Sequence, residues 1–203
     1  KTMLTRRKAL KTFGLSTIGV SLPGFVLAQS TLDSNNPLSI PTLEQGELTD
    51  GVGHFQLKLQ QSSRSFFPDT TTATLGINGN YLGPTLHFRR NEPVSLHVEN
   101  QLGEPTTLHW HGFHVPASED GGPHQVIANE ASWNPQFTVL EFAGTFWYHS
   151  HMLYTAGEQV YKGLAGMIIV EDEEQQLELP STYGVDDIPL IVQDRRFDDD
   201  GAF

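Results

Sequence analysis

Apolar and polar residues alternate along the chain between residues 53 and 172. The clearest run is 92–102. If it forms a strand, Val94, Leu96 and Val98 lie on one face, and the polar residues between them lie on the other. Similar runs of strand length occupy residues 54–62, 72–88, 106–113, 132–142, 144–151 and 164–172. Short strands at this spacing, with little helix signal, predict an all-β sandwich or barrel.

The composition agrees with this prediction and suggests how the chain is divided. The 203 residues include 19 Gly and 12 Pro, which indicates many turns. We expect one domain over residues 46–172, after a flexible lead-in over 29–45 that is rich in Ser, Asn, Pro and Thr. A polar, acidic connector over 173–187 precedes a new apolar strand within 188–203, which suggests the truncated start of a second domain. The sequence also begins with Lys rather than Met, so we expect a fragment of a longer protein.

Residues 1–28 have the order of a bacterial export signal. A basic run containing Arg6 and Arg7 precedes a short apolar stretch, and small residues end with Ala28. The apolar stretch is broken by Pro23, which argues against a membrane span. The paired arginines resemble the twin-arginine signal, although Ala9 stands where that pattern often has Phe. Such signals are read by the machinery that exports folded proteins, so we expect a periplasmic location.

The charge balance excludes one class of partner. The formal net charge is −12, and five of the 12 Lys and Arg lie in residues 1–28, which hold no Asp or Glu. The remainder is therefore more acidic than the whole chain. An acidic surface repels phosphate backbones, so the sequence argues against nucleic-acid binding.

Histidines supply the candidate chemistry. The chain has no cysteine but nine histidines, four of which form the two H-x-H pairs His109–His111 and His149–His151. Residues i and i+2 of a strand point to the same side, so each pair would present two imidazoles from one face. If the two strands are neighbours, four imidazoles form a patch wide enough for more than one metal ion. Imidazoles without thiolates suit copper, zinc, nickel or iron, and the pattern alone does not separate these metals.

The structural alternative is that the four histidines are ordinary core residues. Each would then need a hydrogen-bond partner inside the core, which makes four on one face a demanding arrangement. The other histidines, at positions 54, 87, 97, 114 and 124, are interpreted as non-ligands. Trp110 and Trp147 are expected to be core aromatics that exclude solvent around the site, and Met152 a packing residue.

The flanks of the two pairs carry a family resemblance. The stretches "TTLHWHGFHVPASEDGGP" and "GTFWYHSHMLYTAGEQVYKGLAGMIIVED" resemble the N-terminal cupredoxin domain of the multicopper oxidases. The similarity covers residues 45–200, and bacterial periplasmic cuprous oxidases and bilirubin-oxidase-like enzymes look closest. It implies a cupredoxin-like Greek-key β-sandwich or barrel, followed by the start of a second cupredoxin domain.

The resemblance also implies roles for individual residues. The first histidine of H-W-H-G, here His109, would ligate a type 2 copper, and His111 a type 3 copper. His149 and His151 would ligate the type 3 pair. Asp120 matches an acidic residue near the type 2 copper that assists proton delivery. Reducing O2 to water consumes protons, so a carboxylate near the copper could deliver them. The alternative is that Asp120 is structural and forms an Asx turn before the following glycines.

The same resemblance implies that half of the machinery lies elsewhere. The family's type 1 copper and the remaining trinuclear ligands belong to a C-terminal domain and include a Cys, which this chain lacks. We therefore expect the full-length parent to couple oxidation of a small reductant, Cu(I) or phenol-like, to O2 reduction, and the isolated fragment to be inactive. The alternatives are a non-catalytic relative, such as a periplasmic cell-division protein of this fold that has lost its copper ligands, and a simple copper- or zinc-binding module.

Overall fold

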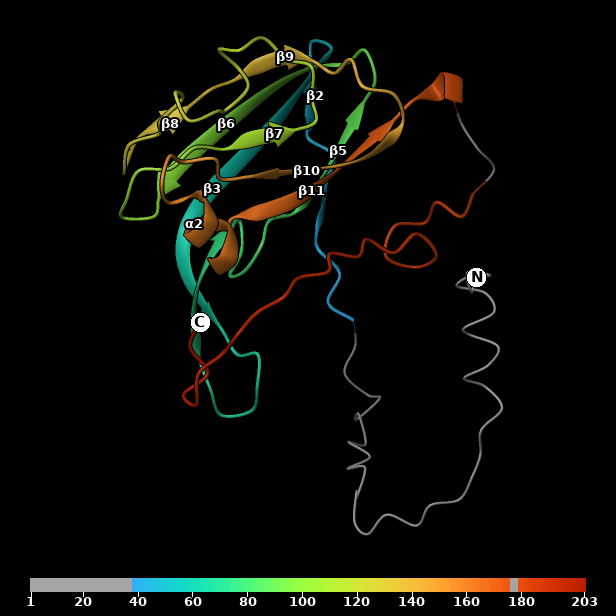
Figure 1. Ribbon diagram of the computed structural model, residues 1–203. Coiled ribbons are helices and arrows are strands. Elements are labelled where there is room, and N and C mark those ends of the chain that lie inside the picture. The colour runs from blue at the N-terminus through green and yellow to red at the C-terminus, as the bar shows by residue number, and fades with distance from the viewer. Residues whose placement is uncertain (1–37, 176–178) are drawn as a thin grey trace, which may run out of the picture. The chain divides into compact units, whose positions relative to one another are not determined.

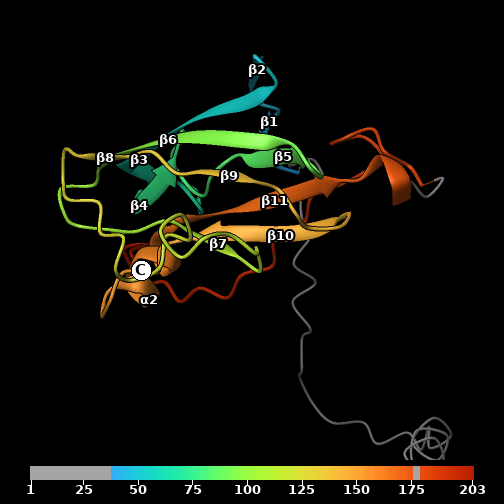
Figure 2. The same cartoon turned by 90° about the horizontal axis from the view of Figure 1, so that it is seen from above.

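The predicted strands build two mixed β-sheets that lie face to face (Figures 1 and 2). The computed structural model describes residues 38–175 and 179–203, and Ser39–Phe203 form one unit. The predicted signal over 1–28 and most of the lead-in over 29–45 lie outside the described residues.

The sheet that carries the histidines has five strands, in the order β1 (Leu43–Glu44), β5 (Thr85–Arg89), β11 (Ala165–Glu171), β10 (Gly144–His149) and β7 (His109–His111). The other sheet runs β2 (Glu47–Thr49), β3 (Val52–Arg64), β6 (Pro93–Gln101) and β8 (Ser132–Trp133), with β4 (Thr72–Ile77) paired to β3 and β9 (Gln136–Thr138) paired to β6. Three pairs are parallel, β1 with β5, β5 with β11, and β3 with β6, and the rest are antiparallel. The prediction of a mostly β sandwich is confirmed.

The core fills the space between the sheets, as the alternation predicts. In the parallel pair of β3 and β6, Phe55 lies beside Leu96 and Leu57 beside Val98, and all four side chains are buried. The intervening polar residues of both strands are less buried. Burying one large apolar side chain contributes roughly 1.5–3 kcal/mol, so this stripe is a main source of stability.

Tyr148 fixes how closely β10 approaches its neighbours. The side chain is fully buried, and its hydroxyl donates a 2.7 Å hydrogen bond to the Pro84 carbonyl. Its cross-strand partner is Gly166, where a Cβ atom would come within 2.3 Å of the tyrosine ring. Only glycine leaves room for the ring at this position, and the ring in turn sets the position of the residue that follows it, His149.

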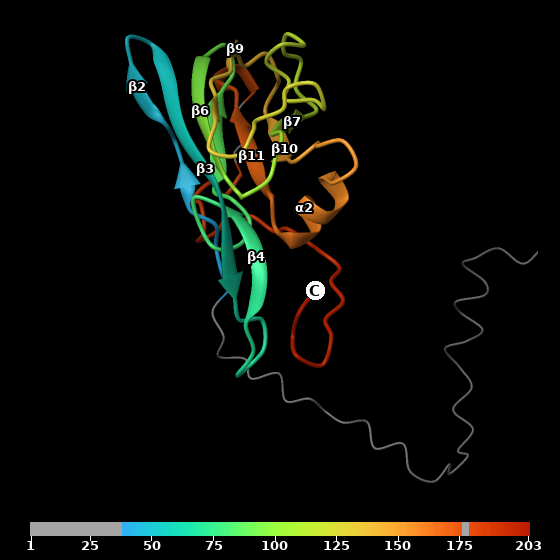
Figure 3. The ribbon, with the colours of Figure 1, turned by 90° about the vertical axis from the view of Figure 1, so that its left-hand side faces the viewer.

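A seven-residue helix, α2 (Ala156–Lys162), connects β10 to β11 and was not predicted. It has a Glu158–Lys162 ion pair at 2.6 Å and ends at Gly163, which has a positive φ of 121°. The only other helical element among the described residues is the 3-10 turn η1 (Glu173–Gln175). Figure 3 shows α2 at the end of the sandwich where β10 ends, with the C-terminal segment passing beside it.

The C-terminal segment differs from the sequence prediction. Residues 188–203, within which a strand was expected, pair with no strand in the described part of the chain. Instead the segment is held by side chains, for example by the Tyr161 hydroxyl, which accepts a 2.7 Å hydrogen bond from the Arg196 N–H. A strand needs a partner for its backbone groups, and the sequence pattern does not show whether one is within reach. The proposed division into domains at 46–172 and 188–203 stays a prediction.

Within the described ranges 38–175 and 179–203, no helix has the length and apolar character needed to cross a membrane.

Candidate metal centre

Adjacent strands bring three of the four predicted histidines together. β7 lies at the edge of its sheet and pairs with β10, with His109 opposite His149 and His111 opposite Trp147. The predicted shared patch was conditional on neighbouring strands, and this condition is met for β7 and for β10 up to His149. His149 is buried, with 9% of its surface exposed, whereas His111 is exposed and His109 is intermediate.

The three imidazoles bring their nitrogens close together. The Nδ1 of His111 lies 3.1 Å from the Nε2 of His149. One ligand nitrogen from each of His109, His111 and His149 falls within 4.8 Å of the others. Two nitrogens bound to one ion at about 2.0–2.1 Å lie about 3–3.4 Å apart at ordinary ligand angles. The His111–His149 separation therefore fits a pair of ligands to a single ion.

Backbone carbonyls fix the direction in which two of the rings point. The Nδ1 of His109 lies 2.9 Å from the carbonyl oxygen of Asp120, and the Nδ1 of His149 lies 2.7 Å from that of Ser150. A carbonyl only accepts, so each Nδ1 must carry the proton and each Nε2 the free lone pair. Metal-binding histidines are typically oriented by such a bond from their second nitrogen. The donor set therefore fits a metal ion that prefers imidazole.

The protonation state of the most buried imidazole also suits this use. Burial lowers the pKa of His149 to about 4, the hydrogen bond to Ser150 partly opposes this shift, and the other three histidines of the cluster lower the pKa further. His149 is consequently neutral at physiological pH, which is the form that binds metals.

His151 reaches the cluster by a different route. β10 ends at His149, so His151 lies beyond the strand, and the expectation that a single strand presents both residues is wrong. Its ring centre nevertheless lies 5.3 Å from that of His109 and 5.9 Å from that of His149. Among the described residues, the group whose ligand atoms lie within 4.8 Å does not include His151. His151 is therefore adjacent to the three-histidine group rather than part of it.

Asp120, which the resemblance assigns to the vicinity of the type 2 copper, lies beside His109. Its carboxylate Oδ1 is 3.3 Å from the Nδ1 of His109, slightly farther than its own carbonyl oxygen, and the side chain is 35% exposed. Within the described ranges no backbone N–H donates to this carboxylate, so the Asx turn is not formed. Whether Asp120 delivers protons stays a prediction.

The segment containing Asp120 is held tightly against β7. The indole N–H of Trp110 donates a 2.9 Å hydrogen bond to the Glu119 carbonyl. Gly121 has a positive φ of 69°, and a Cβ atom there would lie 1.7 Å from the carbonyl oxygen of Leu108. Glycine at position 121 is thus a steric requirement for bringing the Asp120 carbonyl to His109.

The two tryptophans beside the histidines differ from each other. Trp110 is fully buried in the core, as expected. Trp147 is 40% exposed, so the prediction that it is a core residue is wrong. Instead it stacks on His149, with ring centres 4.0 Å apart and planes inclined by 21°. The ring of its cross-strand neighbour His111 is also close, with ring centres 5.0 Å apart.

The other five histidines lie outside the three-histidine group in the described residues, and their non-ligand interpretation stays a prediction. The Nδ1 of His97 is 2.6 Å from an Asn134 oxygen, and the Nε2 of His87 is 3.4 Å from a Glu171 oxygen. Neither position offers a set of three converging ligands within the described residues.

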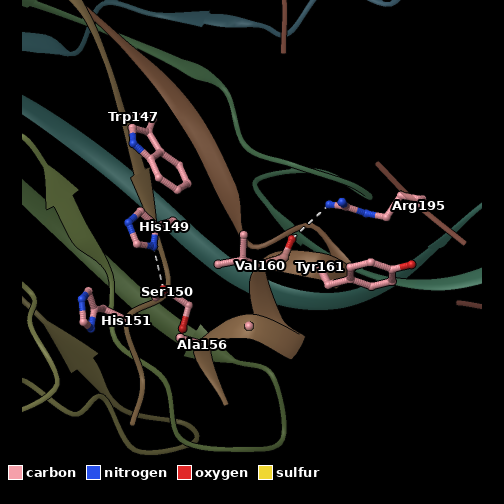
Figure 4. Close-up of a pocket in the computed structure, with 9 residues that line it drawn as sticks. Trp147, His149, Ser150, His151, Ala156, Val160, Tyr161 and Arg195 are labelled. Atoms are coloured by element: carbon pink, nitrogen blue, oxygen red, sulfur yellow. Dashed lines mark hydrogen bonds between the residues drawn. The ribbon is translucent and has the colours of Figure 1, made fainter. Parts of the chain in front are cut away.

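A cavity of about 350 Å³ borders the histidines on the side of α2 (Figure 4). Its lining comprises Trp147, His149, Ser150, His151, Ala156, Gly157, Val160, Tyr161 and Arg195. Sequence reasoning missed this wall of the site because it missed the helix. Two signals could have indicated it: Glu158 and Lys162 at helical spacing, and Gly163 at the end.

Comparison with known proteins agrees with this geometry. Residues 58–175 match the family described as multicopper oxidase. The chain is 38% identical over 163 residues to "Multicopper oxidase mco" of Staphylococcus aureus, covering 80% of this chain and 36% of that protein. It is 36% identical over 200 residues to "Cell division protein FtsP" of Escherichia coli, covering 98% of this chain and 41% of that protein.

Solved structures give the same result. The laccase-like multicopper oxidase CueO from Ochrobactrum sp. superposes with a TM-score of 0.75 at 42% identity, over 82% of this chain and 36% of that structure. The chain therefore spans between a third and about two fifths of the length of these relatives. The match over more than half of the chain, together with the histidine-bearing β-sandwich, shows that this chain belongs to the multicopper oxidase family.

Proposed function

We propose that this chain supplies four histidine ligands, His109, His111, His149 and His151, to a copper cluster at which an oxidase reduces O2 to water. The observation that carries the proposal is the 3.1 Å separation between the Nδ1 of His111 and the Nε2 of His149. In the metal-free chain this separation is a hydrogen-bond distance, and it also fits two ligands on one ion at the place where the family resemblance expects a copper site.

The four histidines divide naturally among several ions. In the proposed assignment His111 and His149 share one ion of the type 3 pair, and His151 binds the other. His109, whose Nδ1 is bonded to the Asp120 carbonyl, binds the type 2 ion through Nε2. The family resemblance carries this division among ions, because His109 lies inside the three-histidine group and His151 lies beside it.

Bound copper would supply the electrons that reduce O2. Burial keeps His149 neutral, and backbone carbonyls orient the rings of His109 and His149. The carboxylate of Asp120 is partly exposed and lies 3.3 Å from the Nδ1 of His109, so it can exchange protons with solvent beside the cluster. Stacking of Trp147 covers one face of His149.

The remaining parts of such an oxidase would come from other cupredoxin domains of the parent protein. A type 1 copper needs a Cys, which this chain does not contain. We therefore propose that the 203-residue chain binds copper without turning over substrate, and that the parent oxidises Cu(I) or a phenol-like reductant.

A second candidate is a structural role in cell division. The similarity to FtsP over 98% of the chain favours it. Copper binding discriminates between the two proposals, because a scaffold needs no converging imidazoles. We favour the oxidase, since the four histidines are present and the rings of His109 and His149 are oriented by backbone carbonyls.

We also propose export to the periplasm by the twin-arginine pathway, on the basis of Arg6 and Arg7 in residues 1–28. Fusing this segment to a reporter protein should direct the folded reporter to the periplasm. Replacing both arginines by lysine should keep it in the cytoplasm, and unchanged export would contradict the proposal.

Copper titration of the purified chain tests the main proposal. Calorimetry and electron paramagnetic resonance should detect tight, stoichiometric Cu(II) binding, and His111→Ala and His149→Ala should each weaken it at least about tenfold. His54→Ala is the matched control, because His54 is exposed on β3 and belongs to no ligand group. Absence of stoichiometric binding would favour the scaffold, and a preference for zinc would favour a simple zinc-binding module.

A further inference from the structure

The β-ladder that positions three of the histidines does not extend to the fourth. His149 is paired with His109 on one side and Ala165 on the other, and it is the last residue of β10. The backbone N–H of His151 instead donates a 2.9 Å hydrogen bond to the side-chain hydroxyl of Thr107. The position of His151 therefore depends on side chains rather than on the sheet.

Ser150 is the centre of this arrangement. Its side chain is fully buried and its N–H donates to the Leu164 carbonyl at 3.2 Å. Its hydroxyl oxygen accepts a 3.3 Å hydrogen bond from the N–H of Met152. The residues on both sides of His151 are thus fixed through one serine, provided that its hydroxyl is itself held.

The group that holds this hydroxyl is the side-chain amide of Gln159 on α2, which is only 1% exposed. Its Oε1 accepts from the hydroxyls of Ser150 at 2.6 Å and Thr106 at 2.7 Å. Its Nε2 donates to the Pro105 carbonyl at 3.0 Å and to a Glu104 carboxylate oxygen at 2.9 Å. All four hydrogen-bonding positions of the amide are used.

This amide joins the two histidine-bearing segments. Residues 104–106 lead into His109, and Ser150 stands between His149 and His151. A buried polar network with every member satisfied is rigid and specifies one arrangement, whereas an apolar side chain of the same size would only fill the space. The amide therefore sets the distance between the two segments at the point where the ladder stops.

We propose that Gln159 is a positioning residue that places His151 for metal binding. The inference rests on the proposed copper site for its purpose, but the geometry that it predicts exists without metal. Gln159 touches none of the four imidazoles in the described hydrogen-bond network, so its effect passes through Ser150 and the adjacent backbone.

The first experiment uses the metal-free chain with isotope-labelled histidine. In Gln159→Met, which keeps the volume and removes the amide, the NMR signals of the His151 imidazole and backbone amide should shift and broaden. The signals of His109 and His111 should stay, because the ladder holds them. Uniform changes over all four histidines, or none, would overturn the proposal.

A matched pair of variants covers the possibility that Gln159→Met does not fold. Thr106→Val removes one hydroxyl donor to Gln159. The control is Thr74→Val in the opposite sheet, which removes a buried hydroxyl of β4 that donates to the Asn80 carbonyl at 2.5 Å. Thr106→Val should move the His151 signals, Thr106→Ser should restore them, and Thr74→Val should leave them unchanged. Equal effects of the two valine variants would contradict the proposal.

The second experiment is a double-mutant cycle on Cu(II) affinity. Gln159→Met should lower the affinity by about 10–100-fold, as loss of a residue that orients a ligand does. If Gln159 acts only through His151, Gln159→Met combined with His151→Ala should bind copper no more weakly than His151→Ala alone. Additive losses would overturn the proposal. Failure of the native chain to bind copper would instead overturn the proposed function, and the NMR comparison would still decide whether Gln159 positions His151.

Discussion

Asp120 orients His109 mainly through its backbone, because its carbonyl oxygen lies 2.9 Å from the His109 Nδ1 and its carboxylate oxygen lies 3.3 Å away. The side chain and the main chain of this residue therefore have separable roles. The carbonyl fixes a ring, and the partly exposed carboxylate is the group to which we assign the proposed proton delivery.

Asp120→Asn should leave Cu(II) affinity within about threefold of the native chain, because the carbonyl that orients His109 is retained. In the parent oxidase the same variant should slow O2 reduction, since an amide does not relay protons at neutral pH. Calorimetry on the chain and oxygen-consumption rates on the parent measure the two effects. A large loss of copper affinity would show that the carboxylate itself is needed to hold His109.

Gly121→Ala should disrupt the metal centre. A Cβ atom at this position would lie 1.7 Å from the Leu108 carbonyl oxygen, so the segment must move away from β7 and take the Asp120 carbonyl with it. We expect at least a tenfold loss of Cu(II) affinity, together with a loss of stability of about 1–3 kcal/mol from strain at a left-handed backbone position.

The neighbouring glycine provides the control for this variant. At Gly122 the nearest atom to an added Cβ is 3.6 Å away, which is ordinary contact. Gly122→Ala should therefore keep both copper affinity and stability. If the two alanine variants behave alike, the close approach of Gly121 to β7 is not what orients His109.

Trp147→Ala should weaken copper binding through His149. The indole stacks on this imidazole with ring centres 4.0 Å apart, and aromatic pairs of this kind contribute about 0.5–1.5 kcal/mol. A tenfold loss of Cu(II) affinity corresponds to about 1.4 kcal/mol and is the upper limit that we expect. Trp147→Phe, which retains a stacking ring, should recover most of the affinity in the same titration.

The stability of the chain should fall at alkaline pH because of Tyr148. Burial raises the pKa of Tyr148 well above its ordinary value of 10.0. As the pH rises past 10, the unfolded chain loses the phenolic proton while the folded chain keeps it, so the free energy of unfolding decreases. This one residue contributes up to about 1.4 kcal/mol per pH unit to that decrease.

Tyr148→Phe tests this prediction by urea unfolding at pH 7 and between pH 10 and 11. At pH 7 the variant should be less stable by about 1–3 kcal/mol, because the buried Pro84 carbonyl loses its donor. Above pH 10 its stability should decline less steeply than that of the native chain. Tyr154→Phe, at a residue that is 96% exposed, should change neither quantity.

Much of the fold was predictable because its strands follow a local rule. Alternation in residues 92–102 places Val94, Leu96 and Val98 on one face whatever strand lies beside them, and the structure buries all three. The short helix α2 was not predictable in the same way. Its charge spacing and its final glycine are local signals for a helix, but a seven-residue helix is too short to be stable by itself, so its existence also depends on packing.

The sequence by itself determined that four imidazoles are available, that His109 and His111 leave one face of a strand, and that the chain is a multicopper oxidase relative. Only the tertiary structure decided how these imidazoles are brought together. Pairing of β7 with β10 sets His109 against His149, the Asp120 carbonyl turns one ring, and Trp147 covers another instead of joining the core.

His151 shows most clearly where prediction from the sequence pattern ends. Its motif suggested a strand, yet its position depends on Thr107 and on a glutamine eight residues farther along the chain, on a helix that the pattern did not reveal. Periodicity fixes the direction of a side chain within one element. Hydrogen bonds between elements fix where the ends of those elements lie, and they exist only once the chain has folded.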